Sequence, residues 1–445
     1  MTTEGFVFDY AKCVGCHACI VACYVENKTQ PPIVWRQINT YNSQKIPLAG
    51  FLNLSIACNH CVEAPCLIAC PAKAYTRDVQ TGAVIHQPEK CIGCQYCTWA
   101  CPFDAPKYNP SKGIVEKCHL CNHLVSVGSK PACTKQCPTG ALSYGLIDKM
   151  GVSESFGLPK TSHQPRFIAT NANVVDVFPE QDISISGLEM NIHNNHTVKL
   201  NTKIHSRDEW PLIIFTFVYS FLAGSIFLFA NFNNMLLKVV YLTIGLLGIL
   251  LSAFHLGKPF RAPRSILNYK TSWLSREILF SGLFFISSNL YLFVFRSNWM
   301  LVIASLLGLM LLVSIERVYS ITRKNYVLPI HSSNTILTAL LFVLLFSGLW
   351  KLLVGLMALK ALLYILRKAY SYEAISLLML LVTAARVLLG LIIPIGIISF
   401  SNASFSLFLL FCLIVGEFID RYEFYNDIYI DTPSRELEQS FSRIA

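Results

Sequence analysis

Hydrophobic and polar positions divide the chain into two parts that predict different folds. The first two hundred residues are polar and interrupted by cysteine-rich stretches, whereas the rest of the chain holds most of the long apolar runs. A hydrocarbon core of about 30 Å requires about 20 consecutive apolar residues in a helix. The contrast therefore predicts a polar domain followed by a membrane helix bundle.

Seven runs in the second part are long enough to cross a membrane as helices. They are 211–230, 236–256, 274–295, 299–317, 334–350, 375–400 and 404–421. The run 352–367 is short and contains Lys360, yet a single helix over 334–368 would be far too long to span once. We therefore predict two helices there, with Lys351 near the turn, and about eight spans in all.

Charged residues inside these spans need partners or a route to water. A central charge costs about 3 kcal/mol, so Arg386 is expected to face the bundle and to pair with Glu417. Lys360 is interpreted as a snorkelling side chain, and Cys412 as a buried small apolar residue. Lys360, Arg386 and Glu417 form no obvious proton path along the sequence, which argues against a pumping role.

Composition supports a membrane protein and argues against nucleic-acid binding. Hydrophobic residues make up 53% of the chain and charged residues only 14%, which is too apolar for an ordinary soluble protein. The net charge is +10, but the basic residues lie in clusters between apolar runs, and no nucleic-acid motif accompanies them.

Sixteen of the seventeen cysteines lie in four groups in the polar part. The groups are Cys13, Cys16, Cys19 and Cys23; Cys58, Cys61, Cys66 and Cys70; Cys91, Cys94, Cys97 and Cys101; and Cys118, Cys121, Cys133 and Cys137. Their spacing is C-x2-C-x2-C-x3-C, with two elongated variants. Three thiolates on a tight loop can hold one iron–sulfur cubane, and the fourth thiolate points to a neighbouring cluster. Sixteen ligands predict four 4Fe–4S clusters.

Disulfides and zinc are the alternatives for so many cysteines. A disulfide framework suits a short secreted domain, but Met1–Tyr10 has neither a basic region nor an apolar core, so no signal peptide is expected. Zinc prefers separated C-x2-C pairs. Iron–sulfur clusters therefore fit the spacing best.

Three stretches, "CNHCVEAPCLIACP", "CIGCQYCTWACPFDAPKYN" and "KCHLCNHLVSVGSKPACTKQCPTGAL", resemble the four-cluster ferredoxin subunit of dimethyl sulfoxide reductase and its molybdoenzyme relatives. The resemblance covers residues 5–150. It implies two ferredoxin-like repeats in which the fourth cysteine of each group is exchanged with a partner group. The implied ligand sets are Cys13, Cys16, Cys19 and Cys137; Cys118, Cys121, Cys133 and Cys23; Cys58, Cys61, Cys66 and Cys101; and Cys91, Cys94, Cys97 and Cys70. Tyr24 departs from the pattern, where the other groups have proline.

Two stretches of the apolar part resemble the membrane anchor subunit of the same family. They are "HLGKPFRAPRSILNYKTSWLSREIL", from His255 to Leu279, and "GEFIDRYEFY" in the last span. This resemblance covers residues 211–427 and implies a menaquinol site without haem. A haem with two histidine ligands is also unexpected because His255 is the only histidine of the spans, and it lies close to a helix end.

Quinol oxidation releases two electrons and two protons, so the site needs groups that take up protons. His255 titrates in the right range to accept a proton from a quinol hydroxyl. Glu277 is expected to receive or relay the proton, and Arg276 to hold its charge. The alternatives are an interfacial histidine bound to a carbonyl and a structural Arg–Glu pair.

Lysine and arginine counts predict the orientation of the bundle. The side of the polar domain carries Lys258, Arg261, Arg264, Lys270, Arg276, Arg317, Arg323, Lys324, Arg367, Lys368 and Arg421. The opposite side carries Lys238, Arg296 and Lys351. The bias places the polar domain on the cytoplasmic face of the inner membrane. The exoplasmic face is the alternative, because relatives can be exported in folded form with a signal-bearing subunit.

The expected architecture is an α+β ferredoxin-like double repeat followed by an all-α membrane bundle. The expected domains are 1–150 with four clusters, a polar linker 151–208, a membrane anchor 209–425 and a polar tail 426–445. The stretch "RFIATNANVVDVF" looks extended, so the linker is expected to pack partly on the first domain.

The resulting hypothesis is a subunit that oxidises menaquinol and passes electrons to a separate molybdopterin catalytic subunit. Two alternatives remain open. Electrons could flow in reverse, from a dehydrogenase to quinone, or the protein could be a coupling module of a larger respiratory complex.

Overall fold

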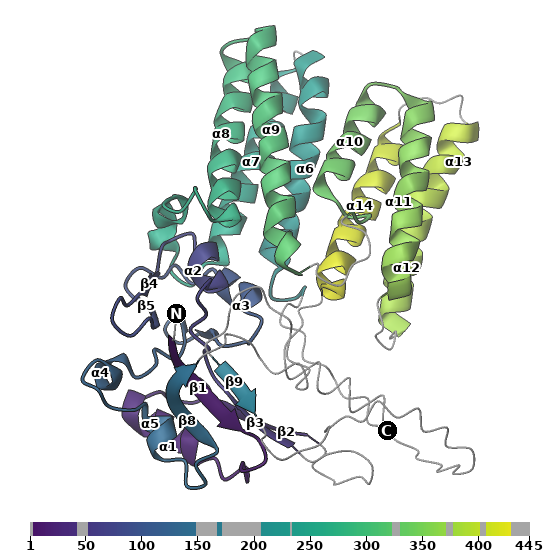
Figure 1. The fold of residues 1–445 in the computed structure, drawn as a ribbon. Helices are drawn as coiled ribbons and strands as arrows, with labels where there is room; N and C mark the ends of the chain where they lie inside the picture. The colour runs from purple at the N-terminus through teal and green to yellow at the C-terminus, as the bar shows by residue number, and fades with distance from the viewer. Residues whose placement is uncertain are drawn as a thin grey trace, which may run out of the picture. The chain divides into compact units, whose positions relative to one another are not determined.

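The computed structural model describes residues 3–41, 52–147, 167–170, 206–231, 234–322, 330–370, 377–400 and 406–428 (Figure 1). The chain divides into two compact units, one of Met1–Lys203 with Ile430–Ala445 and one of Ile204–Tyr429. Most of the expected linker and the tail beyond residue 428 lie outside the described residues.

A three-stranded sheet ties the ends of the first unit together. Strand β1 (Thr3–Asp9) pairs antiparallel with β8 (Leu142–Ile147) and parallel with β9 (Phe167–Thr170). In this register Phe6 lies opposite Tyr144, and the Phe6 side chain is buried. Strand β9 belongs to the stretch expected to be extended, and it pairs with β1 at these four residues; the domain bounds stay a prediction.

Three antiparallel hairpins and five short helices make up the rest of the described residues of the first unit. The hairpins are β2 (Gln37–Tyr41) with β3 (Leu52–Ile56), β4 (Tyr75–Arg77) with β5 (Val84–His86), and β6 (Lys107–Asn109) with β7 (Ile114–Glu116). The helices are α1 (Ala18–Asn27), α2 (Pro65–Ala69), α3 (Tyr96–Ala100), α4 (Asn122–Val125) and α5 (Ala132–Lys135). Helix α1 packs on α5, and α2 packs on α3. This pairing joins the first cysteine group to the fourth and the second to the third.

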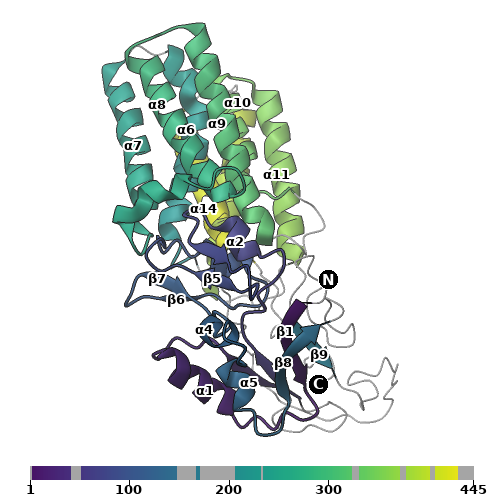
Figure 2. The ribbon, with the colours of Figure 1, turned by 60° about the vertical axis from the view of Figure 1, so that its left-hand side comes forward.

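The second unit is a helix bundle, with α6–α9 side by side and α10–α14 beside one another (Figures 1 and 2). Its long helices are α6 (Trp210–Asn231), α7 (Met235–Phe254), α8 (Trp273–Phe293), α9 (Asn298–Val318), α10 (Thr335–Phe346), α11 (Trp350–Tyr370), α12 (Leu377–Val387), α13 (Ile393–Phe400) and α14 (Leu407–Asp427). Shorter turns are η2 (Pro259–Ile266), η3 (Tyr319–Thr322) and the π-helical η4 (Leu388–Ile392), which joins α12 to α13.

The predicted break in the run 334–368 is confirmed, because α10 and α11 are separate helices. Within the described residues, four helices are both long and apolar enough to cross a membrane: Trp210–Leu228, Met235–Phe254, Asn298–Val318 and Met379–Ser399. Helix α10 has 12 residues. At about 1.5 Å per residue it reaches about 18 Å, less than a hydrocarbon core. The count of eight spans stays a prediction.

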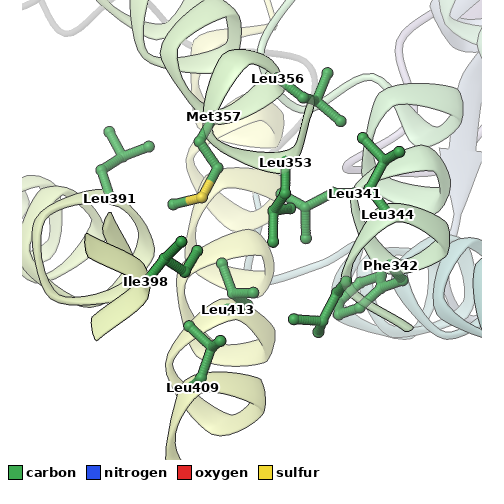
Figure 3. Packing of buried hydrophobic residues seen from close by; sticks show 11 residues of the cluster. Leu341, Phe342, Leu344, Leu353, Leu356, Met357, Leu391, Ile398, Leu409 and Leu413 are labelled. Carbon is green, nitrogen blue, oxygen red and sulfur yellow. The ribbon is translucent and has the colours of Figure 1, made fainter. Parts of the chain in front are cut away.

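A cluster of buried apolar side chains lies inside the second half of the bundle (Figure 3). Leu409 and Leu413 of α14 pack with Leu353 and Met357 of α11 and with Phe342 of α10. A close approach of α6 to α10 is possible because residue 224 is glycine. A Cβ atom there would overlap the Ala339 carbonyl. Helix α10 is therefore held both by the apolar cluster and by this close contact with α6.

Candidate electron-transfer and quinol sites

The structure gathers the sixteen cysteines of the first unit into four sets of four thiols. Set 1 is Cys13, Cys16, Cys19 and Cys137; set 2 is Cys118, Cys121, Cys133 and Cys23; set 3 is Cys58, Cys61, Cys66 and Cys101; and set 4 is Cys91, Cys94, Cys97 and Cys70.

Electrostatic neighbours define these sets. Burial is the largest cause of the raised pKa values of Cys13, Cys61 and Cys97, and in each case the other three thiols of the set raise the pKa further. Burial likewise raises the pKa of Cys23 to about 12, with contributions from Cys133 and Cys121. These four residues sample all four sets, and their thiol neighbours match the implied ligand sets.

Set 2 is also defined by direct contacts. The Asn27 side-chain amide lies 3.6 Å from the sulfur of Cys23 and 3.8 Å from that of Cys121. These two cysteines belong to groups that are far apart in sequence. The structure therefore brings the fourth cysteine of the first group to the loop of the fourth group.

The four C-x2-C loops share one backbone geometry. The residue before the second cysteine has a left-handed conformation in every loop, with φ of 68° at Gly15, 45° at His60, 74° at Gly93 and 66° at Leu120. Glycine adopts this conformation without strain, whereas a residue with a Cβ atom does so at a cost. The shared turn shows that the elongated groups keep the same loop as the compact ones.

The surroundings of the thiols fit an acceptor-rich inorganic group. Backbone amides point at sulfur, since the N–H groups of Ala74, Leu120 and Leu142 lie 3.3 Å from the sulfurs of Cys70, Cys118 and Cys137 respectively. The Asn59 amide is buried, and both its polar atoms lack a partner among the described residues. Sulfides of bound iron–sulfur clusters would accept such hydrogen bonds, and hydrogen bonds to sulfur tune cluster potentials.

Within the described residues, no three His, Cys, Asp or Glu side chains converge on a point that could hold a single metal ion. A four-iron cubane does not require such convergence, because each of its four thiolates binds a different iron.

The sets follow one another in a line. Cys133 of set 2 raises the pKa of Cys19 in set 1, after the larger effect of burial, and Cys58 of set 3 similarly raises that of Cys118 in set 2. Burial raises the pKa of Tyr75, and the charges of Cys97 in set 4 and Cys66 in set 3 raise it further. These charge interactions link the sets in the order 1–2–3–4. Three of the four cysteines of set 1 are exposed or half-buried, so this set lies nearest the surface of its unit.

In the second unit, His255 directly follows α7 and is half-buried. Its Nδ1 atom is within hydrogen-bonding distance of the Ser252 carbonyl. In a neutral ring, Nδ1 then carries the proton and donates to the carbonyl, which leaves Nε2 as a proton acceptor.

Arg276 braces the segment before α8 and does not pair with its neighbour Glu277. Its guanidinium donates to the carbonyls of Tyr269 at 2.9 Å and Lys270 at 2.7 Å, and it lies 4.2 Å from the Trp273 ring centre. Arg276 was expected to hold the charge of Glu277, but in the described residues these two side chains make no contact.

Glu277 points into the bundle instead. Its side chain is only 4% exposed, and its Oε2 atom has no partner among the described residues. Arg421 of α14 is the cation whose charge acts on this carboxyl group. The charge of Glu277 also interacts with the hydroxyl groups of Tyr319 and Tyr425, which hydrogen-bond to each other.

Two nitrogens of the Arg421 guanidinium group donate hydrogen bonds, and the third has no partner among the described residues. Its Nε donates to Thr216 and its Nη1 to the Ser333 carbonyl, both at 3.0 Å, and its Nη2 is buried without a partner among the described residues. A buried carboxyl group, an unpaired guanidinium nitrogen and two phenols thus occur together. Such groups can hydrogen-bond the oxygens of a quinol and take up its proton.

Next to this cluster, a series of ion pairs crosses the interior of the bundle. Lys360 lies 2.8 Å from Glu417, and Arg386 lies 3.1 Å from both Glu417 and Asp420. Arg367 lies 2.8 Å from Asp420. The interpretation of Lys360 as a snorkelling side chain is wrong, because it is fully buried and paired. The predicted pair of Arg386 with Glu417 is confirmed.

Hydrogen bonds to buried side chains hold the start of α10. Ser332 donates to Asp420 at 2.9 Å, and the Thr335 amide donates to Glu316 at 2.9 Å. Asn334 caps the helix by accepting from the Ile336 amide at 3.0 Å. Side chains therefore satisfy the backbone groups that a short helix leaves open inside a bundle.

Comparison with known proteins assigns the family. The family model of the 4Fe-4S dicluster domain matches residues 51–147, and that of the DMSO reductase anchor subunit (DmsC) matches residues 204–408. The B subunit of the anaerobic dimethyl sulfoxide reductase of Escherichia coli (strain K12) is 36% identical over 184 residues, which are 39% of this chain and 89% of the relative. The protein belongs to the dimethyl sulfoxide reductase family of iron–sulfur and anchor subunits. It joins the two kinds of subunit in one polypeptide.

Other members of the family are named for different reactions. The thiosulfate reductase electron transfer subunit PhsB of Salmonella typhi is 36% identical over 159 residues, which are 35% of this chain and 82% of the relative. The formate dehydrogenase iron-sulfur subunit of Haemophilus influenzae is also 36% identical, over 163 residues, which are 33% of this chain and 52% of the relative. The iron–sulfur part is therefore similar in reductases and in a dehydrogenase.

Sequence reasoning missed Arg421, Tyr319 and Tyr425 as members of the Glu277 cluster. Two of them stand in "GEFIDRYEFY", which resembles the family's anchor subunit, so a signal existed. Arg421 and Arg367 were instead counted as loop charges that report orientation. Both are 3% exposed inside the bundle, so neither bears on orientation. The excess of basic residues on that side persists without them.

Proposed function

We propose that this protein oxidises menaquinol and passes the electrons through four 4Fe–4S clusters to a separate molybdopterin catalytic subunit. Membership of the reductase family supports the electron-transfer and anchor roles. The observation that carries the proposal is the buried Glu277 carboxyl group beside Arg421, in a chain whose other unit aligns four sets of four thiols.

The sixteen cysteines of sets 1 to 4 are the proposed cluster ligands. When bound, each cluster takes up and releases one electron at a time. The protein's own residues exclude water, donate amide N–H groups to sulfur and fix the order of the four sites. A linear order gives electrons a single route between set 4 and set 1.

At the quinol site, two hydroxyl protons need two acceptors. Glu277 takes one proton, and the positive charge of Arg421 acts on its carboxyl group. His255 takes the other proton at Nε2, because its Nδ1 faces the Ser252 carbonyl. Arg276 acts as a positioning residue through its bonds to the carbonyls of Tyr269 and Lys270. Two electrons leave the quinol in the same reaction, and no haem is needed.

The protein is proposed to lie in the inner membrane as a multi-pass protein, with the cluster-bearing unit on the cytoplasmic face. The basic residues between the helices support this orientation. The exoplasmic face remains the alternative.

Reverse flow, from a dehydrogenase to quinone, is the second candidate. The similarity to a formate dehydrogenase iron-sulfur subunit favours it. Midpoint potentials distinguish the two directions, because a protein that oxidises menaquinol needs an entry cluster near or above the potential of that couple.

The test is anaerobic reduction of the purified protein with a menaquinol analogue, followed through the visible absorbance of the clusters. Glu277→Gln keeps the side-chain size but cannot accept the proton, so reduction is expected to slow by about 10²-fold or more. Asp208→Asn is the control, because Asp208 is exposed in the same unit. Equal rates for wild type and Glu277→Gln, with full iron content, would refute the site.

A further inference from the structure

Among the described residues of the cluster-bearing unit, two buried cations, Arg36 and Lys117, have no carboxylate partner. Arg36 is 2% exposed and Lys117 is 3% exposed. The ion pairs of the described residues in this unit are Lys12–Asp9, Lys107–Asp104, Lys112–Glu116 and His123–Glu26. A buried charge is costly unless an opposite charge compensates it. Among the described residues, the negative charge that compensates Arg36 and Lys117 must therefore come from groups other than carboxylates.

Arg36 lies between sets 1 and 2. Its Nη1 donates to the Ser55 hydroxyl at 3.1 Å, and that hydroxyl lies 3.5 Å from the sulfur of Cys19 in set 1. The guanidinium also stacks 4.6 Å from the Phe6 ring centre, which fixes its place. From set 2, Cys133 has the largest charge interaction with Arg36. The positive charge of Arg36, held in a fixed position, thus interacts with the thiols of two neighbouring sets.

Lys117 occupies the equivalent place between sets 2 and 3. Its Nζ donates to the carbonyls of Val84 and of Cys118, the latter at 2.9 Å. Cys58 and Cys66 of set 3 and Cys118 of set 2 all interact with its charge. Both oxygen partners are neutral carbonyls, so the hydrogen bonds position the ammonium group but do not neutralise it.

Between sets 3 and 4 the corresponding position holds a neutral side chain. The Tyr75 hydroxyl interacts electrostatically with Cys66 of set 3 and with Cys97 and Cys70 of set 4. The Lys117 ammonium lies 5.9 Å from the Tyr75 ring centre. Each neighbouring pair of sets therefore shares one side chain: Arg36 for sets 1 and 2, Lys117 for sets 2 and 3, and Tyr75 for sets 3 and 4.

We propose that Arg36 and Lys117 set the reduction potentials along the line, with Arg36 raising those of the clusters in sets 1 and 2 and Lys117 those in sets 2 and 3. The inference rests on the proposed function, since it requires clusters in these sets. Reducing a cluster adds one negative charge, and a fixed positive charge nearby stabilises that reduced form. The two cations also weaken the repulsion between electrons on adjacent clusters. Set 2, between both cations, gains most, and set 4 gains least.

The experiment is a redox titration of the full-length protein, reduced chemically and monitored by EPR, in wild type, Arg36→Met, Lys117→Met and the double variant. Chemical reduction keeps the result independent of the quinol site. Each single variant is expected to lower two of the four midpoint potentials. The expected shift is at least tenfold in the ratio of oxidised to reduced cluster, which is 59 mV for one electron. The double variant should show one potential lowered by both changes, one unaffected, and two lowered once.

Arg36→Lys separates charge from packing. This variant changes the contacts with Ser55 and Phe6 but keeps the positive charge. Because the charge determines the potentials, they should stay close to those of the wild type. Unchanged potentials in both methionine variants, with four intact clusters, would overturn the inference. Loss of clusters in Arg36→Met and Arg36→Lys alike would also overturn it, because Arg36 would then serve assembly only. Fewer than four clusters in the wild type would instead refute the proposed function.

Discussion

The buried ammonium of Lys360 offers a quantitative test of the membrane unit. Its Nζ lies 2.8 Å from Glu417 and 3.1 Å from the Thr338 hydroxyl, and the side chain is completely buried. Lys360→Met removes one partner of a buried pair, which typically costs about 3–5 kcal/mol. Glu417 retains Arg386 at 3.1 Å and Thr338 at 2.7 Å, so we expect a loss near the lower end, about 3 kcal/mol.

A snorkelling lysine would behave differently. Replacing it with methionine would remove a charge that is unfavourable in the membrane, and stability would stay constant or rise. Lys351→Met is the matched control, because Lys351 is exposed on the same helix and should change the free energy of unfolding by less than about 0.5 kcal/mol.

The assay is equilibrium unfolding of the detergent-solubilised protein in mixed micelles with dodecyl sulfate, followed by circular dichroism. The combined variant Lys360→Met with Glu417→Gln should lose less than the sum of the single losses, with a coupling of about 0.5–3 kcal/mol. Equal stabilities for Lys360→Met and Lys351→Met would refute the ion-pair network.

Three further outcomes are expected. Gly416→Ala should cost about 1–3 kcal/mol by overpacking, because its Cβ would overlap the Gly390 backbone, whereas Gly355→Ala meets nothing and should be neutral or stabilising in the same unfolding assay. Cys412→Ala should leave the iron and sulfide content of the purified protein unchanged, since Cys412 is buried in α14 and takes no part in the thiol sets; a lower content would contradict the assignment of ligands. Removing iron with a chelator should unfold the cluster-bearing unit but leave the helical signal of the other unit, and an unchanged strand signal would count against metal-coupled folding.

Much of the first unit could be predicted from the sequence because cluster ligation is a local pattern. The C-x2-C loops repeat one turn, and the left-handed position falls on glycine in two of them, at Gly15 and Gly93. Leu120 and His60 adopt the same turn without a glycine signal, so spacing alone carried the prediction there. The places of Arg36 and Lys117 could not be predicted, because they depend on contacts between separate elements: Arg36 stacks on Phe6 of β1, and Lys117 donates to the Val84 carbonyl of another hairpin.

In the membrane unit, hydrophobic runs predicted the helices but not the pairing of their charges. The break between α10 and α11 followed from length, since one helix over both would be too long. The ion pairs of Lys360 and Arg367 depend on which faces of α11 and α14 meet, and a single sequence does not report those faces. For the same reason Glu277 was assigned to its neighbour Arg276, although the structure turns the two side chains apart.

We propose above that quinol oxidation in the helical unit supplies electrons to the four clusters of the other unit. The most direct measurement is an EPR-monitored redox titration of membranes containing the protein, with and without a quinol analogue that cannot be oxidised. We expect four 4Fe–4S signals, one of which changes in potential or line shape when the analogue binds. Four intact signals that do not respond to a saturating analogue would contradict it.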